Sequence, residues 1–135
     1  MYRSEADFSE VFVAFYRAHG YMVQRIESEG TGVGIPDTYA VKSGRHYWIE
    51  VKNMPTTDTP TGSLKVAWRP GQQAWAQAYR HFSGECSYTV VALKKTIAII
   101  PMVKMFRGNI VQYGEYNIVQ TLGDAERVIN GCTIH

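Results

Sequence analysis

Residues 36–52 constrain the fold of this chain more than any other stretch, because they encode two short strands on either side of a tight turn. Ser43-Gly44 favours a two-residue hairpin connection between segments rich in β-branched and aromatic residues. With that turn at the centre, counting outward along both strands places Asp37 opposite Glu50. A four-residue loop on the same centre keeps this register, whereas a three-residue loop breaks it.

Two carboxylates that face each other across a sheet repel, so this pairing predicts a cation between them. Hard divalent cations such as Mg2+ bind through one or two carboxylates and keep several waters. Lys52 lies two positions after Glu50, on the same strand face as Asp37 and Glu50. Two carboxylates, a bound metal ion and the Lys52 ammonium at one place can orient a water and neutralise charge on a phosphate. The alternative is a surface hairpin with ordinary charges, but the apolar run Tyr47-Trp48-Ile49 favours a buried strand.

The remaining hydrophobic pattern predicts alternating helices and strands. An apolar stripe of Phe8, Val11, Phe12 and Phe15 indicates a first helix that Gly20 ends. The expected elements, in order, are a helix over 4–19, a strand over 21–27, the hairpin of 37–42 and 45–52, a helix over 70–82, and strands over 86–93 and 96–102. In the tail we expect a short strand near 116–121 and a helix near 123–130.

Composition narrows the class of protein. The length of 135 residues fits one domain over 1–135, with a core over about 4–102 and an extension over about 103–135. The net charge of +2 does not by itself indicate a nucleic-acid binder. Two isolated cysteines suit a reducing compartment, and the four histidines lack zinc-ligand spacing. No apolar run approaches membrane-spanning length, so we expect no membrane partner and no signal peptide.

Pro36-Asp37 followed by Glu50-Val51-Lys52 resembles the signature of the PD-(D/E)xK nuclease superfamily. The preceding Gly32-Val33-Gly34-Ile35 and the Pro-x-Gln-x-x-Trp helix start at Pro70 resemble the VRR-NUC branch and related phage-encoded nucleases. These are similar in turn to archaeal-type Holliday-junction resolvases, and the resemblance covers about residues 4–93. It implies an α/β fold with a restriction-endonuclease-like core, αβββαβ order and a central mixed sheet flanked by helices.

The same resemblance implies an enzyme that hydrolyses DNA phosphodiester bonds with Mg2+, for which Mn2+ would substitute. Asp37 and Glu50 would bind the metal, the backbone carbonyl of Val51 would complete its ligands, and Lys52 would assist the attacking water. The expected partner is branched or duplex DNA, with branched or junction DNA as the expected substrate. The expected assembly is a homodimer, and the expected location is the cytoplasm of a bacterial host of a phage or prophage.

The resembled nucleases carry a glutamate on the first helix that points at the metal. Glu5 lies on the apolar stripe, whereas Glu10 better fits the usual distance to Gly20 but lies roughly opposite the stripe. Ser9 stands where a simple alignment would place the acid. We take Glu5 as the catalytic candidate; the alternative is an acid favoured by the helix dipole.

Other polar residues are candidates for contact with substrate. Gln72 shares a helix face with Trp75, which directs its amide inward. The resemblance implies that it binds near the metal water or the scissile phosphate; the alternative is a polar residue bonded to backbone. Arg25 is a candidate nucleic-acid contact or a member of a structural ion pair. Lys65 and Arg69 are candidates for DNA backbone contacts, which predict binding that weakens steeply with salt.

The segment 53–69 is long for a connection inside a small domain. It is either a loop that contacts DNA or a partner chain, or a disordered insertion. Trp68 within it is a candidate for stacking on a base, whereas Trp48 and Trp75 suit the core.

Three other functions fit parts of the sequence. A non-catalytic DNA-binding or virion-associated protein could keep the fold, but the intact Asp37, Glu50 and Lys52 argue against this. An RNA-directed nuclease would differ only in substrate. A restriction-type enzyme is disfavoured because we find no helix-turn-helix or zinc finger to read a sequence.

Overall fold

A six-stranded mixed sheet forms the centre of the protein in this computed structural model, which describes the backbone of residues 5–26 and 34–131 and the side chains from residue 7 onward in these ranges. The strand order is β1-β2-β3-β5-β6-β8. All neighbours pair antiparallel except β3 and β5, which are parallel. The strands are β1 (Met22–Arg25), β2 (Thr38–Lys42), β3 (Arg45–Asn53), β5 (Tyr88–Ala92), β6 (Ile97–Pro101) and β8 (Asn117–Val119).

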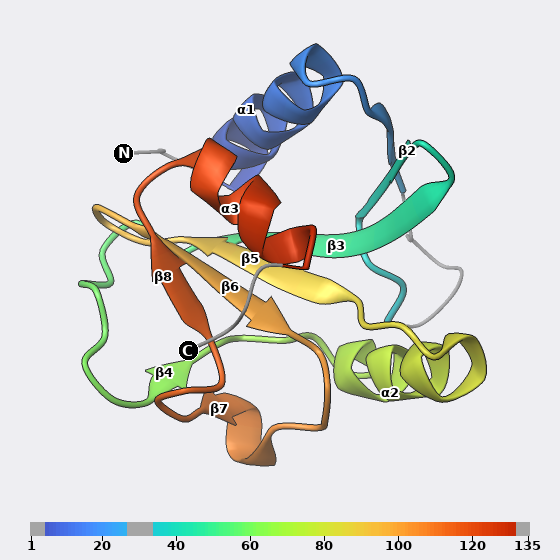
Figure 1. Cartoon of the computed structure of the whole chain (residues 1–135). Helices are drawn as coiled ribbons and strands as arrows, with labels where there is room; N and C mark the ends of the chain where they lie inside the picture. Colours follow the sequence, from blue (N-terminus) through green and yellow to red (C-terminus); the bar gives the residue numbers. More distant parts are fainter. Residues whose placement is uncertain (1–4, 27–33, 132–135) are drawn as a thin grey trace.

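Helices cover both faces of this sheet (Figure 1). One face carries α1 (Glu5–Ala18) and α3 (Leu122–Ile129). The other carries α2 (Gln72–Ser83) and a short ribbon in which β4 (Leu64–Lys65) pairs with β7 (Ile110–Val111) just after the 3-10 turn Arg107–Asn109. This is the predicted fold class, with the order αβββαβ in the first part of the chain; among the described residues, β4 is the one additional strand in that order.

The α1 face is held by aromatic packing. Phe8, Phe12 and Tyr16 are fully buried at helical spacing, and the rings of Phe12 and Tyr16 stack with centroids 4.5 Å apart. They pack on Ile49 and Val51 of β3, which alternate with Glu50 along the strand. Each fully buried side chain of this size contributes roughly 1.5–3 kcal/mol. The apolar alternation of β3 therefore turns Glu50 and Lys52 toward the α2 face.

The segment 53–69 packs against the α2 face of the sheet. Leu64, Val66 and Trp68 are buried there, and the Trp68 ring stacks on Phe106 with centroids 5.4 Å apart. The Trp68 indole N–H also donates to the Thr89 hydroxyl at 2.9 Å. The expectation that Trp68 is free to stack on a base is therefore wrong, because residues of the tail cover it.

The hairpin has the register that the turn predicts. Ser43 and Gly44 both have positive φ, 53° and 78°, as in the mirror-image turns that match the twist of hairpin strands. Lys42 pairs with Arg45 and Thr38 with Ile49, so the next position outward sets Asp37 opposite Glu50.

The predicted tail elements are confirmed as β8 and α3, and the Thr121 hydroxyl caps α3 by accepting the Asp124 N–H at 3.1 Å. Residues 27–33, which include most of the glycine-rich motif, lie outside the described residues. In the described part of the chain, no helix is long and apolar enough to cross a membrane.

Candidate active site

Asp37 and Glu50 are joined through backbone hydrogen bonds where the hairpin strands end their pairing. The Asp37 N–H donates to Glu50 Oε1 at 3.1 Å, and the Val51 N–H donates to Asp37 Oδ1 at 3.1 Å. The Thr38 hydroxyl donates to the same Asp37 oxygen at 2.9 Å. Hydrogen bonds to ionised oxygens are strong and directional, so they fix both carboxylates before anything binds.

Two cations lie beside the other oxygen of Glu50. Lys52 Nζ is 3.7 Å and Arg69 Nη2 is 3.9 Å from Glu50 Oε2. The Glu50 and Lys52 side chains are only 8% and 10% exposed, whereas Arg69 is mostly exposed. These distances exceed hydrogen-bond length, so the cations neutralise the carboxylate without using its lone pairs. Glu50 Oε2 is therefore available to a metal ion.

Arg25 performs the equivalent role for Asp37. Its Nη2 lies 3.8 Å from Asp37 Oδ2, and its Nε donates to the Asp37 backbone carbonyl at 3.2 Å. The register pairs Arg25 with Thr38, which puts it on the α1 face, and its guanidinium also donates to the buried Ser9 hydroxyl of α1. Asp37 Oδ2, like Glu50 Oε2, therefore faces a cation at ion-pair distance.

The carboxylate pair changes the acidity of Asp37. Burial raises the pKa of its carboxyl from the ordinary 3.8 to about 7, and the neighbouring Glu50 charge acts in the same direction. The Thr38 hydroxyl, Arg25 and the Val51 N–H oppose the rise. A divalent cation would remove the cost of the second charge. The donor set of two carboxylates thus fits a hard divalent metal.

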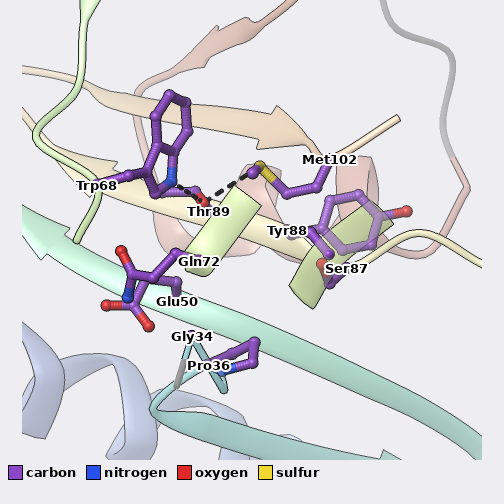
Figure 2. Close-up of a pocket in the computed structure, with 10 residues that line it drawn as sticks. Gly34, Pro36, Glu50, Trp68, Gln72, Ser87, Tyr88, Thr89 and Met102 are labelled. Atoms are coloured by element: carbon purple, nitrogen blue, oxygen red, sulfur yellow. Dashed lines mark hydrogen bonds between the residues drawn. The ribbon is translucent and has the colours of Figure 1, made fainter. Parts of the chain in front are cut away.

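Gln72 brings an unused donor to the same place. Its Oε1 accepts the Arg69 N–H at 2.8 Å, while its buried Nε2 has no hydrogen-bond partner among the described residues. Figure 2 shows Gln72 and Glu50 on the wall of one pocket. Pro36, Trp68 and Thr89 also line it. A buried donor without a partner beside a carboxylate suits a ligand such as water or phosphate.

Comparison with known proteins supports the fold. No protein-family model matches the chain, and no curated protein matches it. Its structure is similar to that of Hjc, a Holliday junction resolvase from the archaeal hyperthermophile Archaeoglobus fulgidus, with a TM-score of 0.61 and 16% sequence identity over 89% of this chain and 97% of that chain. The chain has a restriction-endonuclease-like fold. At this identity the likeness concerns the fold alone.

The restriction-endonuclease-like fold brings most of the predicted site residues together. Seven of them lie around the start of α2 and the open end of the hairpin, far from its turn: Arg25, Asp37, Glu50, Val51, Lys52, Arg69 and Gln72. Lys65 is exposed on β4, paired with Ile110, and makes no described contact with the carboxylates. Glu5 is the first residue of α1, but its side chain lies outside the described residues, and Glu10 is exposed.

Some supporting residues of this site escape sequence reasoning. Gln73, next to Gln72, donates from Nε2 to Asn109 Oδ1 at 2.8 Å and accepts the Phe106 N–H. These bonds tie the start of α2 to the turn before β7. The partners are more than 30 positions apart in sequence, so no local pattern signals them. Ser9 and Thr38 give only a weak signal, as buried hydroxyls on otherwise apolar faces.

Proposed function

We propose that this chain is a metal-dependent endonuclease that hydrolyses phosphodiester bonds in DNA and selects branched or junction structures. The observation that carries the proposal is the Asp37–Glu50 pair with Lys52 beside it. The second support is the fold of the chain, which is similar to that of a protein named as a Holliday junction resolvase. On the sequence motifs we place the chain with VRR-NUC and phage-encoded nucleases, acting in the cytoplasm of a bacterial host.

Asp37, Glu50 and Val51 are the residues that would hold Mg2+, or Mn2+ in its place. The free oxygens Asp37 Oδ2 and Glu50 Oε2 are the carboxylate ligands. The Val51 N–H points at Asp37, and in an extended strand the N–H and C=O of one residue leave the same edge, so its carbonyl is the third donor. A bound divalent cation would supply an activated water and neutralise charge on the phosphate.

Lys52 and Gln72 complete the chemistry from the α2 side of the pair. The buried Lys52 ammonium, next to Glu50, holds the attacking water and stabilises negative charge that develops on the phosphate. The unpaired Gln72 Nε2 donates to a phosphate oxygen or to that water. Arg69, Arg25 and Lys65 then neutralise neighbouring phosphates, which predicts binding that weakens with salt.

A homodimer is part of the proposal, because two symmetric cuts resolve a four-way junction and each chain has one site. The surface we assign to it is aromatic. Trp75 and Tyr79 stack with centroids 5.2 Å apart, Trp48 packs on Trp75 at 5.6 Å, and Phe82 is 85% exposed. An apolar surface of this kind suits a protein partner.

Sedimentation tests this assembly. Phe82→Asp should turn a wild-type dimer at micromolar concentration into a monomer. Tyr113→Asp, which adds the same charge at another exposed aromatic residue (77% exposed), should leave the dimer intact. A wild-type monomer with full junction cleavage would remove the dimer from the proposal.

The decisive experiment is cleavage of labelled four-way junction, flap and linear duplex DNA and an RNA hairpin, each with Mg2+, Mn2+ or EDTA. Metal-dependent cutting of the branched DNA by wild type, lost in Glu50→Ala, is the expected result. Equal cutting of every DNA would keep the nuclease and discard the structural selectivity. Cutting of RNA alone would favour the RNA-directed nuclease, and DNA binding without cutting would favour the non-catalytic protein.

A further inference from the structure

The four carboxylate oxygens of the candidate active site are unequally engaged. Asp37 Oδ1 accepts two hydrogen bonds, from the Thr38 hydroxyl and the Val51 N–H, which occupy both of its lone pairs. Glu50 Oε1 accepts the Asp37 N–H. Asp37 Oδ2 and Glu50 Oε2 have only ion-pair contacts at 3.7–3.9 Å. Each carboxylate therefore has one oxygen that these hydrogen bonds leave unoccupied.

The donors near this pair are few. Among side chains in residues 7–26 and 34–131, no three His, Cys, Asp or Glu gather as a metal-binding group. Ser9 of α1, which is 1% exposed, contacts Arg25: its hydroxyl accepts a hydrogen bond from the guanidinium. Two carboxylate oxygens and a backbone carbonyl, completed by water, are the ligand set of a single hard cation.

Arg25 fixes a positive charge on the α1 side of the pair. Its guanidinium is held by the Ser9 hydroxyl, the Asp37 backbone carbonyl and Asp37 Oδ2. Arginine stays charged at any working pH. Contacts with Ser9 of α1 and with Asp37, the residue before β2, hold the Arg25 side chain in place. A second divalent ion on this side of Asp37 would meet the like charge of this guanidinium.

We propose that the site binds one divalent cation between Asp37 and Glu50, and that Arg25, anchored by Ser9, takes the place of a second. This inference rests on the proposed function, because that function already includes metal binding by Asp37 and Glu50. Arg25 is then a positioning and charge-setting residue of the metal centre as well as a contact for DNA. Together with the Lys52 ammonium, one metal ion and the Arg25 guanidinium give the substrate phosphate three cationic partners.

Mn2+ binding to the metal-free full chain tests the stoichiometry without relying on activity. Electron paramagnetic resonance of free Mn2+ should count one ion per wild-type chain, and Glu50→Gln should abolish this binding. Arg25→Met should tighten Mn2+ binding about tenfold, because a like charge next to the ion is lost, and ten times corresponds to ~1.4 kcal/mol. Arg25→Lys, which keeps the charge, should stay close to wild type.

Two further variants make the result specific. Arg80→Met removes an arginine from α2, where its guanidinium contacts Cys86 Sγ, and should leave Mn2+ affinity unchanged. The double change Ser9→Glu with Arg25→Met supplies a third carboxylate and removes the competing charge, so it should bind two Mn2+ per chain. Thermal unfolding of each metal-free variant confirms that it is folded.

The outcomes separate the two proposals. Two Mn2+ ions in the wild type, or an Arg25→Met affinity equal to that of Arg80→Met, would overturn the single-ion arrangement and leave the nuclease in place. No Mn2+ bound by folded wild type would overturn the metal-dependent nuclease itself.

Discussion

Gly34 touches the backbone of Gly71: a Cβ on Gly34 would lie within 2.9 Å of the Gln72 nitrogen and closer still to the Gly71 carbonyl oxygen. Both glycines have left-handed backbone, with φ of 86° and 89°. The contact joins the segment that leads into Asp37 with Gly71, the residue before α2. It therefore sets how far the Asp37–Glu50 pair lies from Gln72.

Gly34→Ala should destabilise the protein and reduce cleavage together. Any L residue at this φ costs roughly 1–2 kcal/mol, and the added Cβ meets backbone that must shift, for about 1–3 kcal/mol more. Gly114→Ala is the matched control, because its φ is 91° and nothing lies within 4 Å of its Cβ position. Urea unfolding measures both changes; equal losses would show that the Gly71 contact does not matter.

Lys52→Met should abolish most cleavage and keep DNA binding within a few fold. The substitution keeps the buried aliphatic stem and removes the ammonium beside Glu50, so the loss is electrostatic. Loss of a charge-stabilising donor in an active site typically costs about 100-fold or more in rate. Single-turnover cleavage and a filter-binding titration separate the two effects. Binding that falls in parallel with cleavage would make Lys52 a phosphate clamp instead.

Gln72→Leu should slow cleavage roughly 10- to 100-fold, because it removes the buried Nε2 donor at the pocket. Gln77→Leu is a close control on the same helix, since its Nε2 is likewise buried without a hydrogen-bond partner in the described residues. Its cleavage rate should stay near that of wild type. Rates at saturating DNA compare the two variants, and an equal loss in both would assign Gln72 a purely structural role.

Metal-free protein should lose stability as pH rises from about 4 to about 7. Folded Asp37 has its pKa raised to about 7, so over this window it keeps a proton that the unfolded chain releases. The free energy of unfolding of wild type relative to Asp37→Asn should fall by at most about 4 kcal/mol, at ~1.4 kcal/mol per pKa unit. Denaturant titrations across this range measure the difference.

Mg2+ should reverse that loss above neutral pH, because the cation binds the ionised pair. A difference between wild type and Asp37→Asn that stays constant with pH would mean that Asp37 is ionised throughout. A difference that rises with pH would mean that Arg25 and the hydrogen bonds outweigh burial.

Glu5→Gln should reduce cleavage more than Glu10→Gln if the glutamate of the first helix faces the site. Glu10 is exposed, so its change should leave both activity and stability near wild type. Cleavage by the two variants at equal Mg2+ measures the difference. Loss of activity in Glu10→Gln alone would reverse the assignment, and loss in neither would leave Asp37 and Glu50 as the sufficient carboxylates.

Sequence reasoning succeeds where a local rule fixes geometry. The turn at Ser43-Gly44 determines the register and so the meeting of Asp37 with Glu50. Helical periodicity determines that Gln72 points inward. Both follow from repeat lengths of the backbone, which the sequence shows directly.

The contacts missed by sequence reasoning depend on how separate elements pack. Trp68 is covered by Phe106, and Gln73 bonds to Asn109, across spans of more than 30 residues. Arg25, the last residue of β1, meets Ser9 of α1 across 16 positions of sequence. Periodicity shows which side of an element is apolar but not which partner covers it.

The bonds from Gln73 to Phe106 and Asn109 also impose an order on folding during translation. During translation every proposed site residue leaves the ribosome before the turn that secures the start of α2. A nascent chain therefore carries all of its proposed catalytic groups while Arg69 and Gln72 still lack their support. For the proposed nuclease, this delay would keep incomplete chains harmless.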